Sequence, residues 1–255
     1  MVTIPYGVNI PSACPDRRPD PHAALKIVYA GRLVQYQKRV LDLAKIVIEL
    51  DKKNIPFDLI VAGDGLDRGR LERRLNRFIT EGKVRFLGPC AHAKVLSAME
   101  DSDVVIMTSG FEGMPLSLLE AMSRGCIPVV TDLASGIPEL IESDRNGYRV
   151  KVGDIHSFAE RLAFLQSNPG QRQAMMRQAY QTIANSKFCI QNMGASYEKL
   201  FQRVRTEIEA GRYCRPRGRR LQPPLLPEPW LPRIPDIIRM AGLYAQHRFR
   251  RSCFG

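Results

Sequence analysis

Two cationic residues lie close together in the sequence, shortly after its first apolar segment. Arg32 and Lys38 belong to the stretch Gly31–Lys38, which follows the apolar run at 26–30. An arginine presents a planar fork of N–H donors to phosphate oxygens, and a lysine adds a mobile point charge. On one loop the two side chains can converge on a single anion, so the pattern predicts a phosphate site. The alternative is two solvated surface charges, which is how most arginines and lysines occur.

A second cluster combines two carboxylates with a glycine. It runs from Phe111 to Glu120, with Glu112 in a loop after an apolar run and Glu120 inside the helix that follows. Gly113 lets a ligand approach the backbone closely, and the helix start around 114–117 offers unpaired N–H groups to an anion. Glu120 has apolar neighbours in the sequence, so its carboxylate needs a partner. The alternatives are a helix-start acid at Glu112 and an exposed helix face at Glu120.

A third candidate is the stretch from Ser135 to Glu139, where a loop leads into a short helix. Its residue types are also those of an ordinary helix start, with Ser135 as the cap and Glu139 in the first turn. The stretch could therefore contribute to a ligand site or serve only to start the helix, and on the sequence alone we favour the structural role.

The segments around these clusters alternate between strand and helix. Short apolar runs that stop at a glycine predict buried strands, and apolar residues at every third or fourth position predict helices. Strands are expected at 26–30, 57–62, 84–87, 104–107, 127–130 and 148–150, and helices at 39–51, 67–80, 92–100, 115–124, 138–142 and across 154–207. This alternation predicts a Rossmann-like α/β fold, in which a parallel sheet carries helices on both faces.

The three clusters fall at equivalent places in the predicted sheet. Each follows the carboxyl end of a strand, as do the glycines of Gly63-Asp64-Gly65 and Gly88. Parallel sheets of this kind bind their ligands beyond the carboxyl ends of the strands. The polar and glycine-rich residues therefore lie where a ligand site is expected.

Length and composition exclude several classes of protein. The chain has 255 residues, 44% hydrophobic and 25% charged, as in a globular domain rather than a collagen, a disordered chain or a disulfide miniprotein. No apolar stretch reaches about 18 residues, and the first residues lack a signal-peptide pattern. The six cysteines lie far apart and the four histidines are isolated. We therefore expect no metal site and no disulfide framework, and a reducing compartment such as the cytoplasm.

The positive charge is concentrated at the end of the chain. The formal net charge is +12, and residues 211–255 hold ten arginines against two acidic residues. Seven prolines at 211–235 predict an extended or disordered segment, and 236–251 could form a basic amphipathic helix. The sequence thus divides into a linker at 1–25, an α/β domain at 26–207 and a basic tail at 208–255.

Taken together, these motifs resemble those of the C-terminal, nucleotide-binding domain of GT-B glycosyltransferases of family 4, which retain anomeric configuration. The resemblance covers about residues 3–205, with the motifs in the family's order. They are Ile4–Asn9, Gly31–Lys38, Val61–Gly65, Phe86–Gly88, Phe111–Met122 and Gly136–Glu139. The two glutamates separated by seven residues are the most specific of them, and the arginine–lysine pair at its expected place argues against a chance match.

The resemblance implies a role for each matching residue. Arg32 and Lys38 would hold the diphosphate of a nucleotide-sugar donor, Glu112 would face the transferred sugar, and these three would be the catalytic residues. Glu120 would accept hydrogen bonds from the ribose hydroxyls. The backbone before and at the helix start would contact sugar and phosphate, and the end of the third strand would border the nucleobase. These further donor contacts are Gly31, Arg85, Phe86, Leu87, Gly113, Met114, Pro115 and Leu116.

The physical chemistry of the predicted reaction agrees with these roles. As the glycosidic bond breaks, the departing nucleoside diphosphate gains negative charge. Fixed cations stabilise that charge more in the transition state than in the ground state. We therefore expect neither a metal ion nor a cofactor, and the nucleotide-sugar donor is a substrate.

Two features depart from the family. Its enzymes carry a second, N-terminal Rossmann-like domain that binds the acceptor, and this chain begins at the hinge sequence that normally follows that domain. We expect the chain to need an acceptor domain from elsewhere and to be inactive alone. The tail after residue 210 exceeds the usual domain. It could dock on the other domain, lie on an anionic membrane surface, or remain solvated.

Three functions remain in competition. The first is the donor half of a hexosyltransferase that acts on an acceptor glycan or lipid-linked sugar, in the cytoplasm or at a membrane surface. The second is a nucleotide-sugar-binding module without catalysis, as a truncated chain or a split subunit. The third is binding of nucleic acid or of an anionic surface through the tail. We disfavour nucleic acid because only Tyr213 and Trp230 interleave with the arginines of 211–235.

Overall fold

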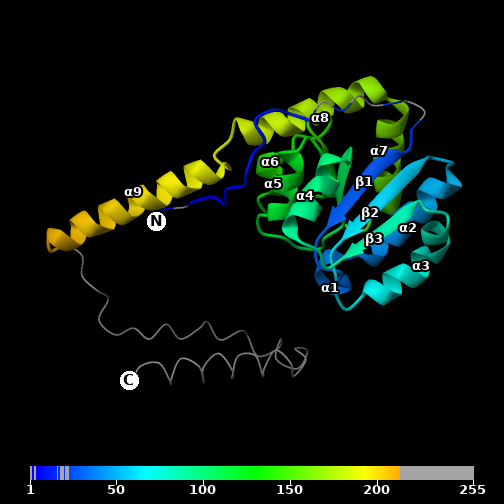
Figure 1. The fold of residues 1–255 in the computed structure, drawn as a ribbon, viewed down its shortest axis with the longest axis horizontal. Helices are drawn as coiled ribbons and strands as arrows, with labels where there is room; N and C mark the ends of the chain where they lie inside the picture. The colour runs from blue at the N-terminus through cyan, green and yellow to red at the C-terminus, as the bar shows by residue number, and fades with distance from the viewer. Residues whose placement is uncertain (1, 3, 16, 18–19, 21–22, 213–255) are drawn as a thin grey trace, which may run out of the picture. The chain divides into compact units, whose positions relative to one another are not determined.

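A computed structural model of the chain describes residues 2, 4–15, 17, 20 and 23–212 (Figure 1). Two compact units follow each other along the chain, Met1–Phe201 and Gln202–Gly255. The first unit contains the whole sheet. The amphipathic helix expected at 236–251 lies outside the described residues.

A six-stranded parallel sheet forms the centre of the first unit, in the order β3-β2-β1-β4-β5-β6. The strands are β1 Leu25–Ala30, β2 Phe57–Ala62, β3 Val84–Gly88, β4 Val104–Met107, β5 Ile127–Thr131 and β6 Tyr148–Val150. The sequence predicts all six, and their ends agree to within one residue. The order reverses between β1 and β4, and this switch point is where such sheets bind ligands.

Nine helices are described, and most follow the predicted periodicity. They are α1 Gln35–Lys38, α2 Leu41–Lys52, α3 Arg68–Thr80, α4 His92–Glu100, α5 Leu116–Met122, α6 Ile137–Leu140, α7 Ile155–Ser167, α8 Pro169–Ala184 and α9 Ile190–Glu209. The sequence does not predict the single turn α1, and the helix predicted from residue 39 begins at Leu41 because Arg39 adopts a left-handed conformation, with φ 49°. Among the described helices, none has both the length and the hydropathy of a membrane span.

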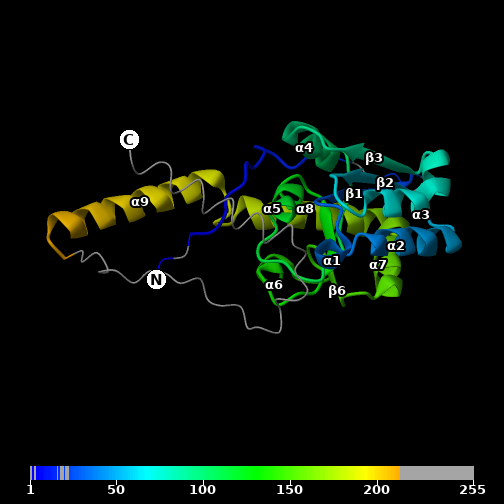
Figure 2. The same ribbon diagram turned by 90° about the horizontal axis from the view of Figure 1, so that it is seen from below.

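The helices cover both faces of the sheet, as the predicted Rossmann-like α/β class requires. In Figure 2, α2 and α4 lie on opposite sides of β1. One core, with α2, α3 and α7, receives Leu25, Ile27 and Tyr29 from β1. The other, with α4 and α5, receives Val28 and Ala30. This alternation is the two-residue period of a strand, and the burial of each large aliphatic side chain contributes about 1.5–3 kcal/mol.

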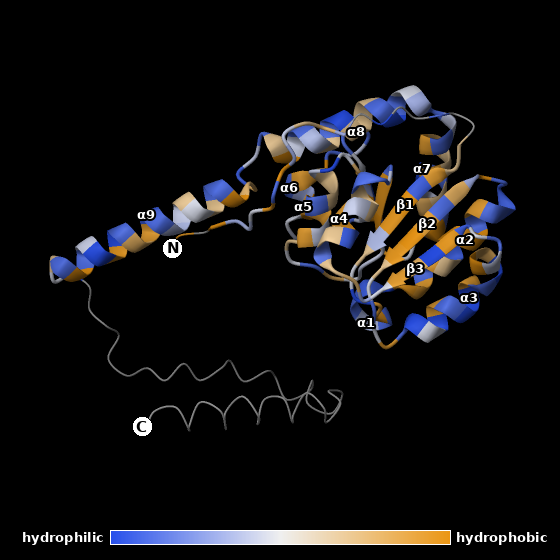
Figure 3. Cartoon of the chain, viewed as in Figure 1, coloured by the Kyte–Doolittle hydropathy of each residue, from blue (hydrophilic) through white to orange (hydrophobic). Residues whose placement is uncertain are grey.

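The strands read as almost continuous hydrophobic runs, which Figure 3 shows as orange arrows between helices of mixed colour. All four residues of β4 and all five of β5 are buried. A strand buried on both faces has no polar side to alternate with, which is typical of parallel sheets between two helix layers. This burial leaves polar side chains to the loops at the strand ends.

The described part of the N-terminal linker packs against the domain. Val8 is buried, and its N–H donates to the carbonyl of Phe188, after α8, at 2.8 Å. The hydroxyl of Tyr180 donates to the carbonyl of Pro11 at 2.9 Å. Arg17 donates to backbone carbonyls at the ends of α4 and α5, at 2.8 and 2.7 Å, which also ties this segment to the domain. Composition alone does not reveal these contacts.

Candidate functional site

The loop after β1 is shaped by two glycines of the loop after β2. Gly63 has φ 139°, and a Cβ there would lie 2.0 Å from the carbonyl oxygen of Gly31. A Cβ on Gly65 would lie 2.5 Å from the carbonyl oxygen of Leu33, whose N–H donates to the carbonyl of Asp64 at 2.8 Å. A side chain at either glycine would push the two loops apart. The glycines therefore fix the loop that carries the predicted phosphate ligands.

Asp67 fixes the other end of this loop. One of its carboxylate oxygens accepts from the backbone N–H of Gln35, at the start of α1, at 2.7 Å. The other accepts from Arg70 at 2.6 Å. The Gln35 N–H, with a smaller contribution from Arg70, holds the pKa of Asp67 below its usual value. The charged carboxylate thus anchors α1 at neutral pH.

Arg32 lies on this loop with an exposed side chain. The buried hydroxyl of Tyr29 donates to its carbonyl oxygen at 2.9 Å, and its guanidinium donates to the side-chain oxygen of Gln37 at 2.7 Å. Burial raises the pKa of Tyr29 well above its usual value, and the nearby carboxylate of Glu112 raises it further. Tyr29 therefore remains a neutral donor that holds the backbone at Arg32.

Lys38 and Glu112 form an ion pair between α1 and the loop after β4. The Lys38 Nζ atom lies 2.5 Å from Oε1 of Glu112, and the two side chains are only 14% and 7% exposed. The hydroxyl of Ser109 donates to the same carboxylate oxygen at 2.6 Å. The hydroxyl of Thr108 donates to the carbonyl of Lys38 at 2.9 Å. Two predicted catalytic residues are thus brought together across the switch point.

Glu120 has a partner on a different helix. Its Oε1 atom lies 2.8 Å from Nε2 of His92, the first residue of α4. The His92 side chain is 66% exposed and that of Glu120 is 19% exposed. His92 therefore has one carboxylate partner, and so does His156, whose Nε2 atom lies 3.0 Å from Oε1 of Glu160. The His92 contact depends on how α4 and α5 pack, which the sequence does not show, whereas His156 and Glu160 stand four residues apart on one helix.

The third cluster packs against the second. The N–H of Gly136 donates to the carbonyl of Gly113 at 3.1 Å. A Cβ on Gly136 would lie 2.3 Å from the Cε atom of Met114, so this glycine permits a close approach. The hydroxyl of Ser135 accepts from the N–H of Ile137 at 3.2 Å. The cap residue of α6 is Gly136 rather than the predicted Ser135, because the helix begins only at Ile137, while Glu139 lies in the first turn as predicted. The stretch therefore supports the loop of Gly113 and Met114.

The next two residues lead from that loop into α5. Pro115 is buried and precedes the helix, and Leu116, its first residue, has a side chain that is 43% exposed. The helix therefore begins one residue later than predicted, with an apolar side chain open to solvent at the carboxyl edge of the sheet.

The three predicted nucleobase neighbours on β3 do not share one surface. Phe86 packs against the core with α3, and Leu87 packs against the core with α4. Arg85, between Val84 and Phe86, is exposed. Successive residues of a strand point to opposite faces, so only Leu87 and Arg85 lie on the face of α4.

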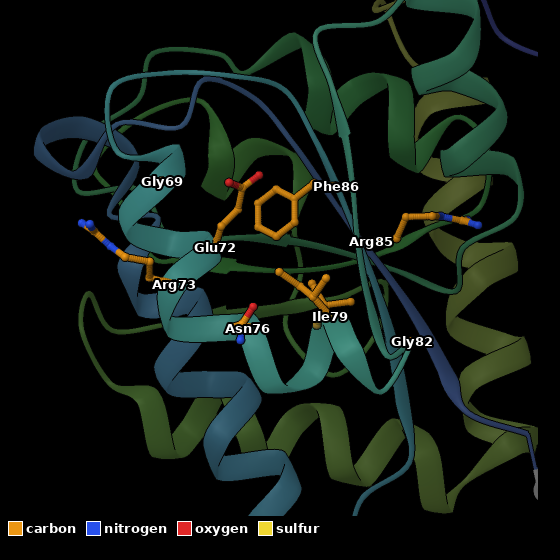
Figure 4. A pocket seen from close by; sticks show the side chains of 9 residues that line it. Gly69, Glu72, Arg73, Asn76, Ile79, Gly82, Arg85 and Phe86 are labelled. Carbon is orange, nitrogen blue, oxygen red and sulfur yellow. The ribbon is translucent and has the colours of Figure 1, made fainter.

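A hollow of about 780 Å³ lies between β3 and α3 (Figure 4). Glu72 and Phe86 point toward each other across it, whereas Arg85 points away. The two predicted phosphate ligands and the two predicted glutamates do not line this hollow. It is therefore separate from the groups gathered at the switch point.

The fold and the residues at its switch point define a Rossmann-like domain of the GT-B type, similar to the C-terminal domain of such enzymes. The family model described as "Glycosyl transferases group 1" matches residues 16–182. The chain belongs to this family, which agrees with the resemblance found in its motifs.

Known proteins of this family match over most of the domain. A protein of Escherichia coli (strain K12) named "Putative colanic acid biosynthesis glycosyltransferase WcaL" is 32% identical over 164 residues, which are 62% of this chain and 40% of that protein. The lipopolysaccharide 1,6-galactosyltransferase of the same organism is 30% identical over 147 residues, 56% of this chain and 40% of that protein. This chain spans about two fifths of the length of these relatives.

Solved structures share the fold. The crystal structure of a mutant of S. aureus TarM, in complex with Fondaparinux, alpha-GlcNAc-glycerol and UDP, matches with a TM-score of 0.63 and 22% identity. The match covers 78% of this chain and 38% of that one. At this level of identity the comparison concerns the arrangement of strands and helices.

Proposed function

We propose that this chain is the donor-binding domain of a retaining, family 4 glycosyltransferase that transfers a hexosyl group from a nucleotide diphosphate sugar. The observation that carries the proposal is the 2.5 Å pair of Lys38 and Glu112 at the switch point, next to the loop of Arg32. A phosphate that takes Lys38 from this pair frees the carboxylate to accept hydrogen bonds from sugar hydroxyls. In the bound donor, Lys38 then contacts the diphosphate and Glu112 contacts the sugar, on the two sides of the glycosidic bond that breaks.

The two cations account for the chemistry that we propose. Arg32 and Lys38 stabilise the negative charge that develops on the leaving diphosphate, more in the transition state than before it. We propose that this replaces a metal ion, so that EDTA leaves donor binding unchanged. Attack by the acceptor on the face that the diphosphate leaves retains the anomeric configuration. The presence of UDP in the TarM complex supports a nucleoside diphosphate as the ligand.

The remaining contacts follow the position of each residue. We place the ribose at Glu120, and the sugar and diphosphate along the backbone from Gly113 to Leu116. The nucleobase lies at the end of β3. At this strand end, Leu87 packs against the core formed with α4 and α5, and Glu120 is a residue of α5. Phe86 packs against the other core, with α3.

The acceptor site belongs, in this proposal, to a part of the enzyme beyond this chain. The chain spans 40% of the length of either relative, which supports a second domain. Their names mention colanic acid biosynthesis and a lipopolysaccharide, which supports a glycan or lipid-linked acceptor. The chain alone then binds donor without transferring it, in the cytoplasm or at the cytoplasmic surface of a membrane.

Isothermal titration calorimetry of the full chain with UDP, GDP and ADP tests the proposal. One nucleotide is expected to bind with a clear preference, and Arg32→Ala and Lys38→Ala each to weaken it about tenfold or more. Arg32 is exposed, so its variant keeps the fold. Lys53→Ala, which removes an exposed lysine just after α2, is the control and leaves binding unchanged. Absence of binding for all three nucleotides at millimolar concentration refutes the proposal.

A further inference from the structure

A histidine outside the predicted donor contacts touches one of the predicted carboxylates. We propose that His92 is a positioning residue that fixes the carboxylate of Glu120 for the ribose hydroxyls, and so helps the site select ribonucleotides over deoxyribonucleotides. This inference rests on the proposed function, because that proposal assigns the ribose to Glu120. It adds a residue that none of the sequence motifs contains.

The positions of α4 and α5 make this contact well defined. His92 is the first residue of α4, four residues after Gly88 at the end of β3. Figure 1 shows α4 beside α5, and the two helices pack against each other. The buried Met99 on α4 and Leu119 on α5 belong to one core. His92 and Glu120 thus extend from two anchored helices, and the 2.8 Å contact between them joins two rigid elements.

The contact leaves the carboxylate free to bind a ligand. A carboxylate offers about four acceptor positions on its two oxygens, and His92 uses one of them, on Oε1. Oε2 and the second position of Oε1 remain for two neighbouring hydroxyls. A glutamate side chain loses rotational freedom when it binds a ligand. His92 restricts that freedom before the ligand arrives, so less affinity is lost on binding.

Arg124, which follows α5, does not hold the carboxylate of Glu120 in the way that His92 does. Arg124 donates to the side chain of Glu100 at 3.2 Å and to the backbone carbonyl of Glu120 at 3.1 Å. Neither contact reaches the carboxylate of Glu120. The imidazole donates through Nε2–H both as the neutral tautomer that carries this proton and as the imidazolium.

A contact made by a side chain as exposed as that of His92 contributes little to folding stability. The 66% exposure of the His92 side chain therefore allows substitutions that keep the fold. His156 provides a matched control, because it is 63% exposed and lies 3.0 Å from Glu160 on α7, a carboxylate to which the proposed function gives no role.

The test compares a nucleoside diphosphate with its 2′-deoxy form, by calorimetry on the full chain with the base that binds best. Wild type is expected to prefer the ribose form about tenfold. His92→Ala is expected to weaken binding of the ribose form about fivefold and to change binding of the 2′-deoxy form by less than about twofold. His92→Gln, which keeps an N–H donor, restores part of the loss, and His156→Ala leaves both affinities unchanged.

Other outcomes overturn the inference. Equal losses for the two forms in His92→Ala indicate a structural role, and no loss indicates no role. A wild type that binds both forms equally removes the selectivity on which the inference depends. If wild type binds nucleotide and Arg32→Ala weakens it, the proposed function stands even when His92 fails. If wild type binds neither form, the proposed function itself fails.

Discussion

Lys38 and Glu112 are 74 residues apart in the chain, and their charged groups lie 2.5 Å from each other. One is on α1, after β1, and the other follows β4, so the pair joins the two halves of the sheet at the point where the strand order reverses. Both side chains are largely shielded from solvent. The pair therefore couples the integrity of the site to the assembly of the whole sheet.

Removing the charge of Lys38 leaves the shielded carboxylate of Glu112 without its charged partner, although it keeps its hydrogen bond from Ser109. We expect Lys38→Met to lower the free energy of unfolding by about 3 kcal/mol, because an unpaired charge in such a place is costly. Adding Glu112→Gln should recover more than half of this loss. Urea denaturation followed by circular dichroism measures both.

Lys45→Met is the matched control for this prediction. Lys45 pairs with Asp42 at 2.8 Å but is 53% exposed, and Asp42 keeps Arg39 at 2.7 Å. The expected change is below about 1 kcal/mol. An equal loss in the Lys38 variant and the double variant would show that the charge is not the cause.

Gly63 and Gly69 provide a contrasting pair. A methyl group at Gly63 meets the carbonyl oxygen of Gly31 at 2.0 Å, and its φ of 139° strains any other residue. We expect Gly63→Ala to destabilise the fold by at least about 2 kcal/mol and to weaken nucleotide binding, since the loop of Arg32 must move. Gly69, on α3, has no atom within 4 Å of such a methyl group, and Gly69→Ala should stabilise by about 0.5 kcal/mol. Thermal unfolding and calorimetry measure these effects, and unchanged binding in Gly63→Ala would contradict the assigned loop role.

The strands and the location of the site can be predicted because they depend on local patterns. An apolar run such as 104–107, ended by polar and glycine residues, is typical of a strand buried on both faces. Once β1 and β4 are recognised as parallel strands, the residues after them must lie at one edge of the sheet. Spacing and context therefore suffice to assign Arg32, Lys38 and Glu112 to a common edge.

The contacts that complete the site depend on how elements pack, which the spacing does not encode. His92 and Glu120 are 28 residues apart on two helices, and their meeting requires α4 and α5 to lie side by side. Asp67 reaches the N–H of Gln35 only because the two glycines of the preceding loop permit close approach. A short helix such as α1 is equally hard to predict, because one turn has no periodicity to detect.

Cys126 should be unreactive in the folded protein. Its side chain is fully buried, and burial raises the pKa of its thiol to about 12. Only the thiolate reacts readily with alkylating reagents, so the folded protein should protect this residue at pH 8. Cys90, which is partly exposed, provides the comparison. Iodoacetamide labelling followed by peptide mass spectrometry should find Cys90 modified first and Cys126 only after denaturation; early labelling of Cys126 would contradict its burial.

The anchor at Asp67 should make stability depend on pH. Because the pKa of Asp67 is lower in the folded chain than its ordinary value of 3.8, its carboxylate contributes stability above pH 3.8. That contribution is lost as the pH falls through the folded-state pKa. Asp67→Asn keeps an acceptor for the Gln35 N–H but loses the charge, so wild type should melt about 2–5 °C higher at pH 7, and the difference should vanish in strong acid.

Asp58→Asn is the control for this pH dependence, because Asp58 is an exposed aspartate on β2 that lies outside the loop anchored by Asp67. Its variant should melt within about 1 °C of wild type at pH 7, as is usual for surface substitutions. Calorimetric melting curves between pH 2.5 and 7 measure both variants. The difference in melting temperature between wild type and Asp67→Asn is expected to shrink as the pH falls. If it grows instead, the carboxylate does not anchor α1 through its charge.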